Sequence, residues 1–455
     1  MVSLLEAIVG KSYVITQREQ LLNYLIDETA DMVRPAPAAD LVLVKPANAQ
    51  EISKMLLLSN EKDIPFFPRG GGTGLVGGAV PTQDGIILSM ERMKEISIDK
   101  ANLLAIAEAG VTLEELASAA SKVGLFFALH PGDESAQVGG LVATNAGGSR
   151  AIKHGVMRNA VRGLEVVLPT GEILTMGGRL RKNNVGFDLM QLVIGSEGAL
   201  AVVTKAILQL ESKPKATGTL VIPYNNRHDA LVTVPEILQD GRLPLAIEYV
   251  EKDLMESTAK LLGENWPVKI GMCYLMIIVS ESSRDQVLSE SVKIDEICRR
   301  HGSLESLFVE AQQDQDRILR IRSNIYSSMK SETADILDVT VPPSELASVM
   351  DQVEEIAKKD GSFMPMLGHA ADGNLHVQIV KRQSTDTGYV DRLRDQVYQV
   401  TVSAGGVITG EHGIGKIRTR KLGLNLSEKE IQLMKEIKRM FDPKNILNPG
   451  TKILV

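Results

Sequence analysis

The eleven residues "PRGGGTGLVGG" at positions 68–78 contain six glycines and lie between two short apolar runs. From Gly72 onward they follow the G-x-G-x-x-G spacing of a nicotinamide-binding Rossmann turn. That turn needs a helix to open within it, but Pro81 and Gly85 follow closely and would break one. A Rossmann unit also needs an acidic residue after its second strand, about 20 residues on, and none is evident. The stretch therefore does not predict an NAD site.

The same glycines fit an anion-binding loop better. Glycine lets backbone N–H groups approach a ligand closely, and successive N–H groups form a concave anion site. The alternative is a flexible surface loop, but this stretch joins the apolar runs 64–68 and 86–90 and lacks the serines and charges of a linker. Two further glycine-rich stretches, 130–150 and 193–210, also adjoin apolar runs. Three such turns favour one extended ligand that is held by backbone.

The whole-chain composition limits the partners and the chemistry. The 455 residues are enough for two or three domains, and 44% of them are hydrophobic. The net charge of -7 and the lack of a long basic run argue against nucleic acid as a partner. Two cysteines, Cys273 and Cys298, cannot form a disulfide framework or hold an iron–sulfur cluster, which usually takes four. Any electrons that move here must use another carrier.

The N-terminus and the hydropathy predict where the protein resides. The first 20 residues lack the basic start, apolar core and cleavage site of a secretory signal. No uninterrupted apolar run approaches the ~20 residues of a membrane-spanning helix. We therefore expect a cytoplasmic protein with no integral membrane segment, with peripheral attachment through a partner as the alternative.

The periodicity predicts an α+β chain in three parts. Residues 1–35 are expected to be helical, and residues 36–213 alternate short apolar strands with amphipathic helices. A polar stretch with proline and glycine at 211–219 marks a boundary, and residues 214–455 follow a split β-α-β pattern. Capping boxes are predicted at Thr112 with Glu115 and at Ser427 with Glu430. In the last part helices are expected at 225–239, 282–301, 311–330 and 344–359, and strands at 244–250, 271–279, 336–341 and 375–380.

Three of the seven histidines lie within 44 residues of one another. His369 and His376 flank the turn signal "ADGN", so a strand–turn–strand would fold one back toward the other. His412 follows Glu411 in "GEHGIG". Two imidazoles and one carboxylate match a first-row divalent metal site with open positions. The alternative is a set of structural histidines, and no cysteine pair nearby supports a zinc finger.

Adjacent residues in an extended chain point to opposite sides, so Glu411 and His412 are not expected to bind one metal together. We therefore expect Glu411 to be a metal ligand and His412 to accept a proton. Upstream, Arg320 and Arg322 in "RILRIRSNI" could each pair with a substrate carboxylate through two parallel hydrogen bonds. For either arginine alone, a charge on a helix surface is the alternative.

Several ordered motifs closely resemble a known family. "PRGGGTGLVGG", "HPGDESAQVGGLVATNAGG", "GLEVVLPTGEIL" and "KNNVGFDLMQLVIGSEGALAVVT" occur in this order. They resemble the vanillyl-alcohol-oxidase/PCMH flavoproteins, in the branch of the FAD-linked D-2-hydroxy-acid dehydrogenases. This branch includes D-lactate dehydrogenase, the D-type component of glycolate oxidase and D-2-hydroxyglutarate dehydrogenase. The resemblance implies an α+β protein: a PCMH-type FAD-binding domain of two α+β subdomains, then an FAD-linked oxidase C-terminal domain that is ferredoxin-like and binds the substrate.

The resemblance implies FAD-binding residues in each glycine-rich stretch. The positions implied for the pyrophosphate loop are Pro68, Arg69, Gly70, Gly71, Gly72, Thr73, Gly74, Gly77 and Gly78. Those implied for the rest of the cofactor are Pro131, Gly132, Asp133, Gly139, Gly140, Thr144, Asn145, Gly147, Gly148, Gly195, Glu197, Gly198, Val202 and Asn448. Some members attach FAD covalently through His or Cys, but no His lies in or just before 68–78 and both cysteines lie far beyond. We therefore expect non-covalent FAD.

The resemblance also implies the reacting groups. In metal-dependent members the matching positions bind a divalent cation (zinc, manganese or iron), and here they are His369, His376 and Glu411. His412 would be the general base, Asn374 would lie near the substrate, and Arg322 would match the substrate arginine. One departure is minor, Ala371 where Gly is common.

A larger departure concerns the substrate. The 2-hydroxyglutarate dehydrogenases place a lysine six residues before a proline to hold the distal carboxylate, whereas Ile336 stands here. An apolar residue disfavours a second substrate charge, so D-lactate or glycolate is expected. The implied reaction gives the 2-oxo acid with hydride transfer to flavin N5.

The resemblance leaves the electron acceptor and some alternatives open. Electrons would pass to an electron-transfer flavoprotein, an iron–sulfur subunit or quinone, and the protein could be a homodimer. One alternative is an FAD enzyme on the same scaffold that acts on another alcohol. A second is a non-catalytic flavin-binding subunit of an oxidoreductase complex.

Overall fold

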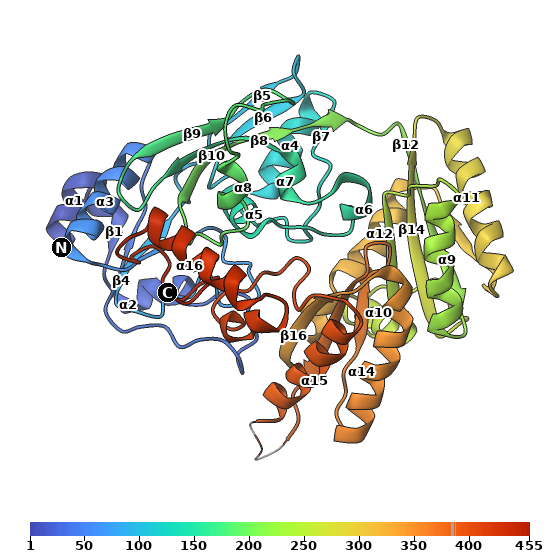
Figure 1. Ribbon diagram of the computed structural model, residues 1–455. Helices are drawn as coiled ribbons and strands as arrows, with labels where there is room; N and C mark the ends of the chain where they lie inside the picture. Colours follow the sequence, from blue (N-terminus) through green and yellow to red (C-terminus); the bar gives the residue numbers. More distant parts are fainter. Residues whose placement is uncertain (384–385, 387) are drawn as a thin grey trace. The chain divides into compact units, whose positions relative to one another are not determined.

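The computed structural model describes residues 1–383, 386 and 388–455 (Figure 1). The chain forms two compact units, called unit 1 and unit 2 below. Unit 1 comprises residues 1–147, 155–213 and 411–455. Unit 2 comprises residues 148–154 and 214–410. The last 45 residues therefore pack with the N-terminal part of the chain.

Unit 1 contains short helices and three sheets. Its helices are α1 (Val2–Val9), η1 (Lys11–Tyr13), α2 (Arg18–Leu21), η2 (Leu22–Tyr24), α3 (Ala49–Lys62), α4 (Leu113–Lys122), α5 (Val138–Thr144), α7 (Met157–Ala160), α8 (Met190–Val193), η4 (Thr419–Leu424) and α16 (Glu428–Phe441). Its strands are β1 (Val14–Ile15), β2 (Leu41–Val44), β3 (Phe66–Arg69), β4 (Gly85–Ser89), β5 (Ile96–Asp99), β6 (Leu104–Glu108), β7 (Leu125–Phe126), β8 (Val161–Val167), β9 (Ile173–Gly177), β10 (Val202–Gln209) and β11 (Glu211–Ser212).

The N-terminal region differs from the expectation of a helical segment. Residues 1–35 contain only short helical pieces, and Val14–Ile15 forms strand β1, which pairs antiparallel with β2. Pairing with a distant strand overrides the weak local helix preference there. Both predicted capping boxes are confirmed, since Thr112 and Ser427 each accept a hydrogen bond from the backbone N–H three residues on.

The first sheet holds the glycine loop. Its strand order is β1-β2-β4-β3, with β4 parallel to both β2 and β3. Strand β3 ends at Arg69, and no helix lies between it and β4. The prediction that this stretch is not a Rossmann turn is thereby confirmed. The second sheet has the order β5-β6-β10-β8-β9 and is antiparallel, and its buried face packs against α4 and α5.

Unit 2 is built on one antiparallel sheet of seven strands, in the order β15-β12-β14-β13-β17-β18-β16. The strands are β12 (Ala216–Tyr224), β13 (Ala246–Glu251), β14 (Cys273–Glu281), β15 (Leu307–Val309), β16 (Thr333–Thr340), β17 (Met366–His369) and β18 (Asn374–Val380). The helices are α6 (Ala151–His154), α9 (Arg227–Gln239), α10 (Lys252–Leu261), α11 (Arg284–Arg300), α12 (Gln312–Ser323), α13 (Ile325–Met329), η3 (Pro343–Glu345), α14 (Leu346–Asp360) and α15 (Tyr389–Ser403).

The predicted helices and strands of this part are confirmed, with ends shifted by a few residues. One difference is that the helix expected at 311–330 is divided at Asn324 into α12 and α13. Helices α10, α12 and α13 pack on the sheet face that carries Val250 and Met276. Helices α9 and α11 pack on the opposite side of β12 and β14 (Figure 1). The site described below lies on the face with Val250.

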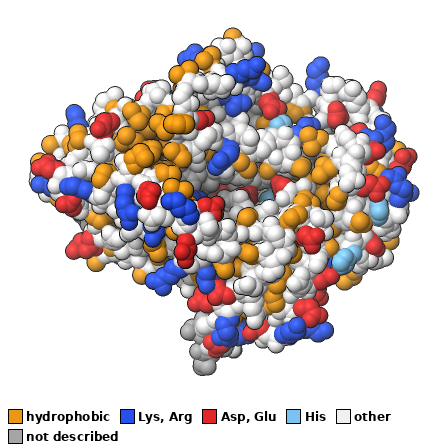
Figure 2. Space-filling view, viewed as in Figure 1, with side chains coloured by type: hydrophobic (Ala, Val, Ile, Leu, Met, Phe, Trp, Pro, Cys, Tyr) orange, Lys and Arg blue, Asp and Glu red, His pale blue; other side chains and the backbone are white. Residues whose placement is uncertain are grey.

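The surface carries charges of both signs. Acidic and basic side chains are interspersed over the face shown in Figure 2. Among the residues that the structure describes, no helix combines the length and the apolar character needed to cross a bilayer.

Candidate functional site

Unit 1 brings two of the predicted cofactor loops together. A Cβ added to Gly70 would lie 3.5 Å from the Cβ of Gln137 and 3.6 Å from the backbone N of Gly140. A Cβ on Gly74 or Gly140 would meet no described atom within 4 Å, so both glycines border open space. Gly72 has a φ of +75°, which disfavours any other residue. The two loops form a cradle that is lined by backbone and lies open at Gly74 and Gly140.

One buried polar atom at this cradle has no hydrogen-bond partner among the described residues. It is the Oε1 atom of Gln137, which lies beside Gly70. Arg69 is already engaged, because its Nη2 donates to the carbonyl of Asn23 at 2.8 Å. Burial lowers the pKa of Arg69, although Asp27 opposes this. The buried Oε1 atom of Gln137 could therefore accept a hydrogen bond from a ligand in the cradle.

The predicted residues Glu197 and Asn448 hold the cradle in place. The Glu197 carboxylate accepts hydrogen bonds from the backbone N–H groups of Ile414 at 2.9 Å and Gly415 at 2.6 Å. Asn448 donates from Nδ2 to the carbonyls of Gly78 at 3.2 Å and Glu197 at 2.9 Å. These contacts tie the C-terminal segment to two of the glycine loops.

The sequence did not single out Lys416, which lies buried in the same place. Its Nζ donates to the carbonyl of Gly78 at 3.1 Å and to Oδ1 of Asn448 at 2.9 Å. Burial lowers the pKa of Lys416 to about 7, although Asp27 and Glu197 oppose this. The only available signal was its place directly after "GEHGIG".

The remaining predicted cofactor residues lie in several environments. Asn145 has a φ of +53° and accepts a hydrogen bond from Arg158 N at 2.9 Å. Thr144 donates from its hydroxyl to the carbonyl of Gly140 at 3.0 Å, within α5. Val202 is 1% exposed and belongs to the hydrophobic core behind β4. Gly148 is grouped with unit 2 by its packing.

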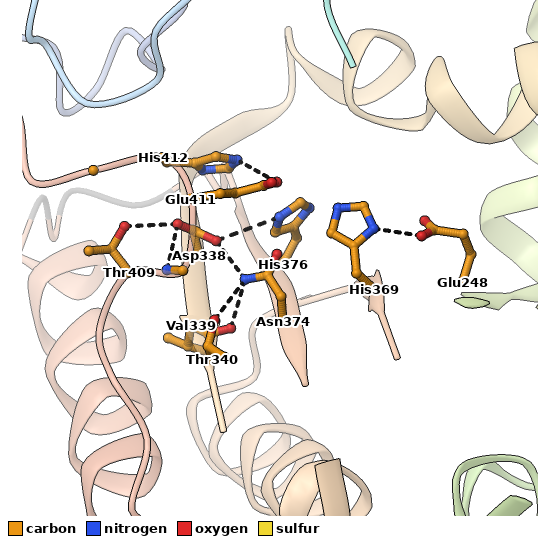
Figure 3. Close-up of polar contacts among 12 residues, drawn as sticks. Glu248, Asp338, Val339, Thr340, His369, Asn374, His376, Thr409, Glu411 and His412 are labelled. Atoms are coloured by element: carbon orange, nitrogen blue, oxygen red, sulfur yellow. Dashed lines mark hydrogen bonds and ion pairs between the residues drawn. The ribbon is translucent and has the colours of Figure 1, made fainter. Parts of the chain in front are cut away.

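In unit 2 the predicted histidine hairpin is confirmed. Strands β17 and β18 pair antiparallel, with His369 opposite Asn374 and Leu367 opposite His376. Residues directly opposite share a face of the sheet, as do residues two apart, so both imidazoles project from the same face. Their ring centroids lie 5.5 Å apart at an interplanar angle of 85°. Figure 3 shows the two rings next to each other.

Asp338, which the sequence did not single out, lies on β16 opposite His376. Its carboxylate accepts from Nδ2 of Asn374 at 2.7 Å, the hydroxyl of Thr409 at 2.8 Å and the N–H of Gly410 at 2.9 Å. The His376 Nε2 atom lies 3.7 Å from it. The Asn374 Oδ1 atom is buried and, among the described residues, has no hydrogen-bond donor. That oxygen can therefore accept a further hydrogen bond.

Glu248 was also missed, and it lies on the other side of His369 (Figure 3). Its two carboxylate oxygens lie 2.6 Å from Nδ1 of His369 and 2.5 Å from Nη2 of Arg322. Burial raises the pKa of Glu248, but His369 and Arg322 together hold it below its usual value. Arg320, by contrast, is exposed and paired with Glu264, so it is a surface charge. Of the two predicted arginines, the structure brings Arg322 to the histidines.

Glu411 and His412 are the first residues of unit 1 after the chain leaves unit 2. The expectation that their side chains point to opposite sides is wrong. The backbone bends at both residues instead of running extended, and Glu411 Oε1 lies 3.8 Å from His412 Nε2. A Cβ added to Gly147, one of the predicted cofactor glycines, would lie 2.8 Å from the Glu411 carboxylate. Glu411 is thus packed on the glycine turn at 147.

Comparison with protein families defines the class. Residues 41–177 match the family described as an FAD binding domain, and residues 213–451 match the C-terminal domain of FAD linked oxidases. The second match alone covers more than half of the chain. The chain belongs to the FAD-linked oxidase family and is an FAD-dependent oxidoreductase.

Individual relatives are similar over nearly the full chain. A D-lactate dehydrogenase of Archaeoglobus fulgidus is 42% identical over 427 residues, which are 94% of each chain. The glycolate oxidase subunit GlcD of Bacillus subtilis is 34% identical, over 90% of this chain and 88% of its own.

Solved structures share the fold at low identity. The 4-ethylphenol oxidase of Gulosibacter chungangensis matches with a TM-score of 0.80 at 16% identity, over 100% of this chain and 96% of its own. A p-cresol methylhydroxylase matches with a TM-score of 0.80 at 17% identity, over 99% of this chain and 96% of its own. These likenesses confirm the predicted PCMH-type fold.

Proposed function

We propose that this enzyme oxidises a D-2-hydroxy acid to the 2-oxo acid, with D-lactate or glycolate as the favoured substrate. The observation that carries the proposal is the pair His369 and His376 on adjacent strands, beside buried Glu248 and Arg322. The two imidazoles could bind a cation, and the arginine could bind a carboxylate of the substrate. If the two histidines had only a structural role, no arginine would be required beside them. Relatives named D-lactate dehydrogenase and glycolate oxidase subunit support the same substrate class.

His369, His376 and Glu411 would hold a divalent cation, which would be zinc, manganese or iron. Imidazole and carboxylate ligands suit these ions. In support, one ligand atom each of His376, Glu411, Asp338 and His412 lies within 4.8 Å of the others. His369 is not in that group, but its ring lies next to that of His376 with Nδ1 toward Glu248, so Nε2 would be its ligand atom. When bound, the cation would lower the pKa of the substrate hydroxyl, as it does for bound water.

The protein side chains would orient the substrate and take its proton. The Nε atom of Arg322 is buried and has no hydrogen-bond partner within the described part of the chain, so it can donate to the substrate carboxylate. The Oδ1 atom of Asn374 would accept a hydrogen bond from the substrate. His412 would take the hydroxyl proton, since histidine is the side chain that most often serves as a general base.

The cofactor is proposed to be bound without a covalent link. Backbone N–H groups of the loop at 68–78 would hold the pyrophosphate, with Gly74 and Gly140 leaving room for it. When bound, FAD supplies the hydride acceptor at flavin N5. Ile336 is 3% exposed and lies two residues from Asp338 on β16, where it would give the substrate pocket an apolar wall. This wall favours a monocarboxylate.

Electrons would leave through a partner, because two buried cysteines cannot carry a cluster. An electron-transfer flavoprotein, an iron–sulfur subunit or quinone could each take them. We propose a cytoplasmic location, with attachment to a membrane surface through that partner as the alternative. The enzyme could also be a homodimer.

The deciding experiment is anaerobic flavin reduction across D- and L-2-hydroxy acids, with metal content measured on the same sample. D-lactate or glycolate should bleach the yellow enzyme, and a chelator should slow the bleaching while FAD stays bound. Bleaching by another alcohol without any metal would favour the alternative FAD enzyme on this scaffold. A yellow protein that no hydroxy acid reduces would favour a non-catalytic flavin-binding subunit.

A further inference from the structure

Glu248 joins two groups of the proposed site that come from different elements. It stands in the middle of β13, directly opposite His369 on β17, so the strand register sets their contact. Arg322 reaches the other carboxylate oxygen from α12. Glu248 is 3% exposed, and neighbouring strands flank it on both sides. Its side chain therefore has little freedom to turn away from either partner.

A buried carboxylate in this position controls the chemistry of the imidazole. In a neutral histidine only one ring nitrogen carries a proton, and the hydrogen bond made by one nitrogen decides which. The Glu248 carboxylate lies 2.6 Å from Nδ1 of His369, so this contact favours the tautomer with the proton on Nδ1 and with Nε2 as the ligating atom. The Arg322 guanidinium compensates the buried negative charge of Glu248, which would otherwise be costly.

We propose that Glu248 is a positioning residue for both the cation and the substrate. One oxygen fixes His369 with Nε2 as the ligating atom, and the other holds Arg322 beside the same histidines. The inference rests on the proposed metal site. It adds a residue that touches neither cation nor substrate and acts through the two groups that do.

The primary test is Glu248→Gln in the FAD-loaded protein. A glutamine of the same size removes the charge and can present its amide N–H to Nδ1, which favours the wrong tautomer. We expect affinity for Zn²⁺ or Mn²⁺, measured by competition with a chelator, to fall about 10–100-fold. Flavin absorbance and FAD content should stay unchanged. With Co²⁺ bound, the visible spectrum should also change, because the geometry at His369 is altered.

The matched control is Asp335→Asn. Asp335 is a buried carboxylate on the same sheet, and it pairs with buried Arg394 at 2.7 Å. Its loss should lower thermal stability as much as Glu248→Gln does, without changing metal affinity. If Glu248→Gln does not fold, Glu248→Asp keeps the charge but shortens the reach to His369, and should weaken metal binding to a smaller extent.

The outcomes separate this inference from the proposed function. If the wild type binds the cation tightly and folded Glu248→Gln or Glu248→Asp binds it equally well, the role of Glu248 is refuted while the metal site stands. If the wild type binds none of Zn²⁺, Mn²⁺ and Fe²⁺ after reconstitution, the metal site itself is wrong and Glu248 loses its role with it. A fall in metal affinity that Asp335→Asn matches would show a general loss of packing and would also overturn the inference.

Discussion

The candidate site in unit 1 is formed mainly by backbone, whereas the one in unit 2 is formed mainly by side chains. In unit 1 the cradle consists of backbone, and its defining feature is the lack of side chains at Gly74 and Gly140. In unit 2 the site consists of side chains, and some of them contact a partner on another strand, as His369 contacts Glu248. Backbone N–H groups bind an anion whatever its detailed structure, whereas chemistry on a substrate needs groups with a set protonation state.

Because of this difference, mutations in the two sites should affect different measured properties. Adding a methyl group in the cradle takes up ligand space but leaves the reacting groups intact. Removing an imidazole is expected to leave the cofactor bound but to stop the proposed reaction. Separate measurements of cofactor binding and flavin reduction can therefore test whether the division of labour between backbone and side chains is real.

The largest effect is expected from His412→Ala. Loss of a general base should slow flavin reduction by a D-2-hydroxy acid by about 10²–10⁴-fold, while FAD content stays at the wild-type level. Stopped-flow absorbance under anoxia measures the rate. His228→Ala is the control, because His228 is an exposed residue paired with Asp351 at 2.6 Å and should have no effect. Reduction of the His412 variant at the wild-type rate would rule out the base assignment.

A smaller effect is expected from Gly74→Ala, which tests the cradle. Because a Cβ there meets no described atom within 4 Å, the stability of the FAD-free protein should change by less than about 0.5 kcal/mol. The FAD dissociation constant should rise about tenfold or more, which corresponds to about 1.4 kcal/mol, since the methyl group occupies the ligand's space.

Fluorescence titration of the FAD-free protein with FAD measures this effect. Gly423→Ala is its control, because a Cβ there also meets open space but lies outside the loops. Unchanged FAD affinity in Gly74→Ala would mean that the cofactor does not pass this glycine.

The sequence predicted the parts of both sites whose residues are close together along the chain. The loop at 68–78 is one uninterrupted stretch, and His369 and His376 are joined by a short turn. Glu248 could not be found this way, because 121 residues separate it from His369 and only the pairing of β13 with β17 brings them together. For Lys416 and Gly78 the separation is 338 residues.

Two wrong expectations have a common physical cause. Residues 1–35 contain a strand because Val14–Ile15 pairs with β2, and a local helix preference cannot foresee that pairing. Glu411 and His412 approach each other because the backbone bends, whereas alternation of side chains holds only for an extended chain. In both cases tertiary structure decides the local backbone conformation.

The smallest effect concerns two carboxylates of the same strand, the buried Glu248 and the half-buried Glu251. Glu248 has close partners that hold its pKa below the usual value, whereas burial raises the pKa of Glu251 to about 7, only partly opposed by Arg227 at 3.8 Å. A carboxyl group with a raised pKa in the folded state binds more protons there than in the unfolded chain. Its contribution to stability is therefore present below its unfolded pKa and is lost as the pH rises through 7.

Glu251→Gln removes this penalty, so it should stabilise the protein by about 0.5–1 kcal/mol at pH 8 and change it little at pH 4, where the carboxyl is protonated when folded. Urea unfolding at both pH values measures the difference. Glu355→Gln, an exposed carboxylate paired with Lys359 at 3.3 Å, should show no such pH dependence. Equal stability of Glu251→Gln and wild type at pH 8 would mean that Arg227 compensates Glu251 as fully as His369 and Arg322 compensate Glu248. A half-buried carboxylate on β13 would then be tolerated although it has no role in the site. Low exposure on this strand would not by itself identify Glu248 as a positioning residue.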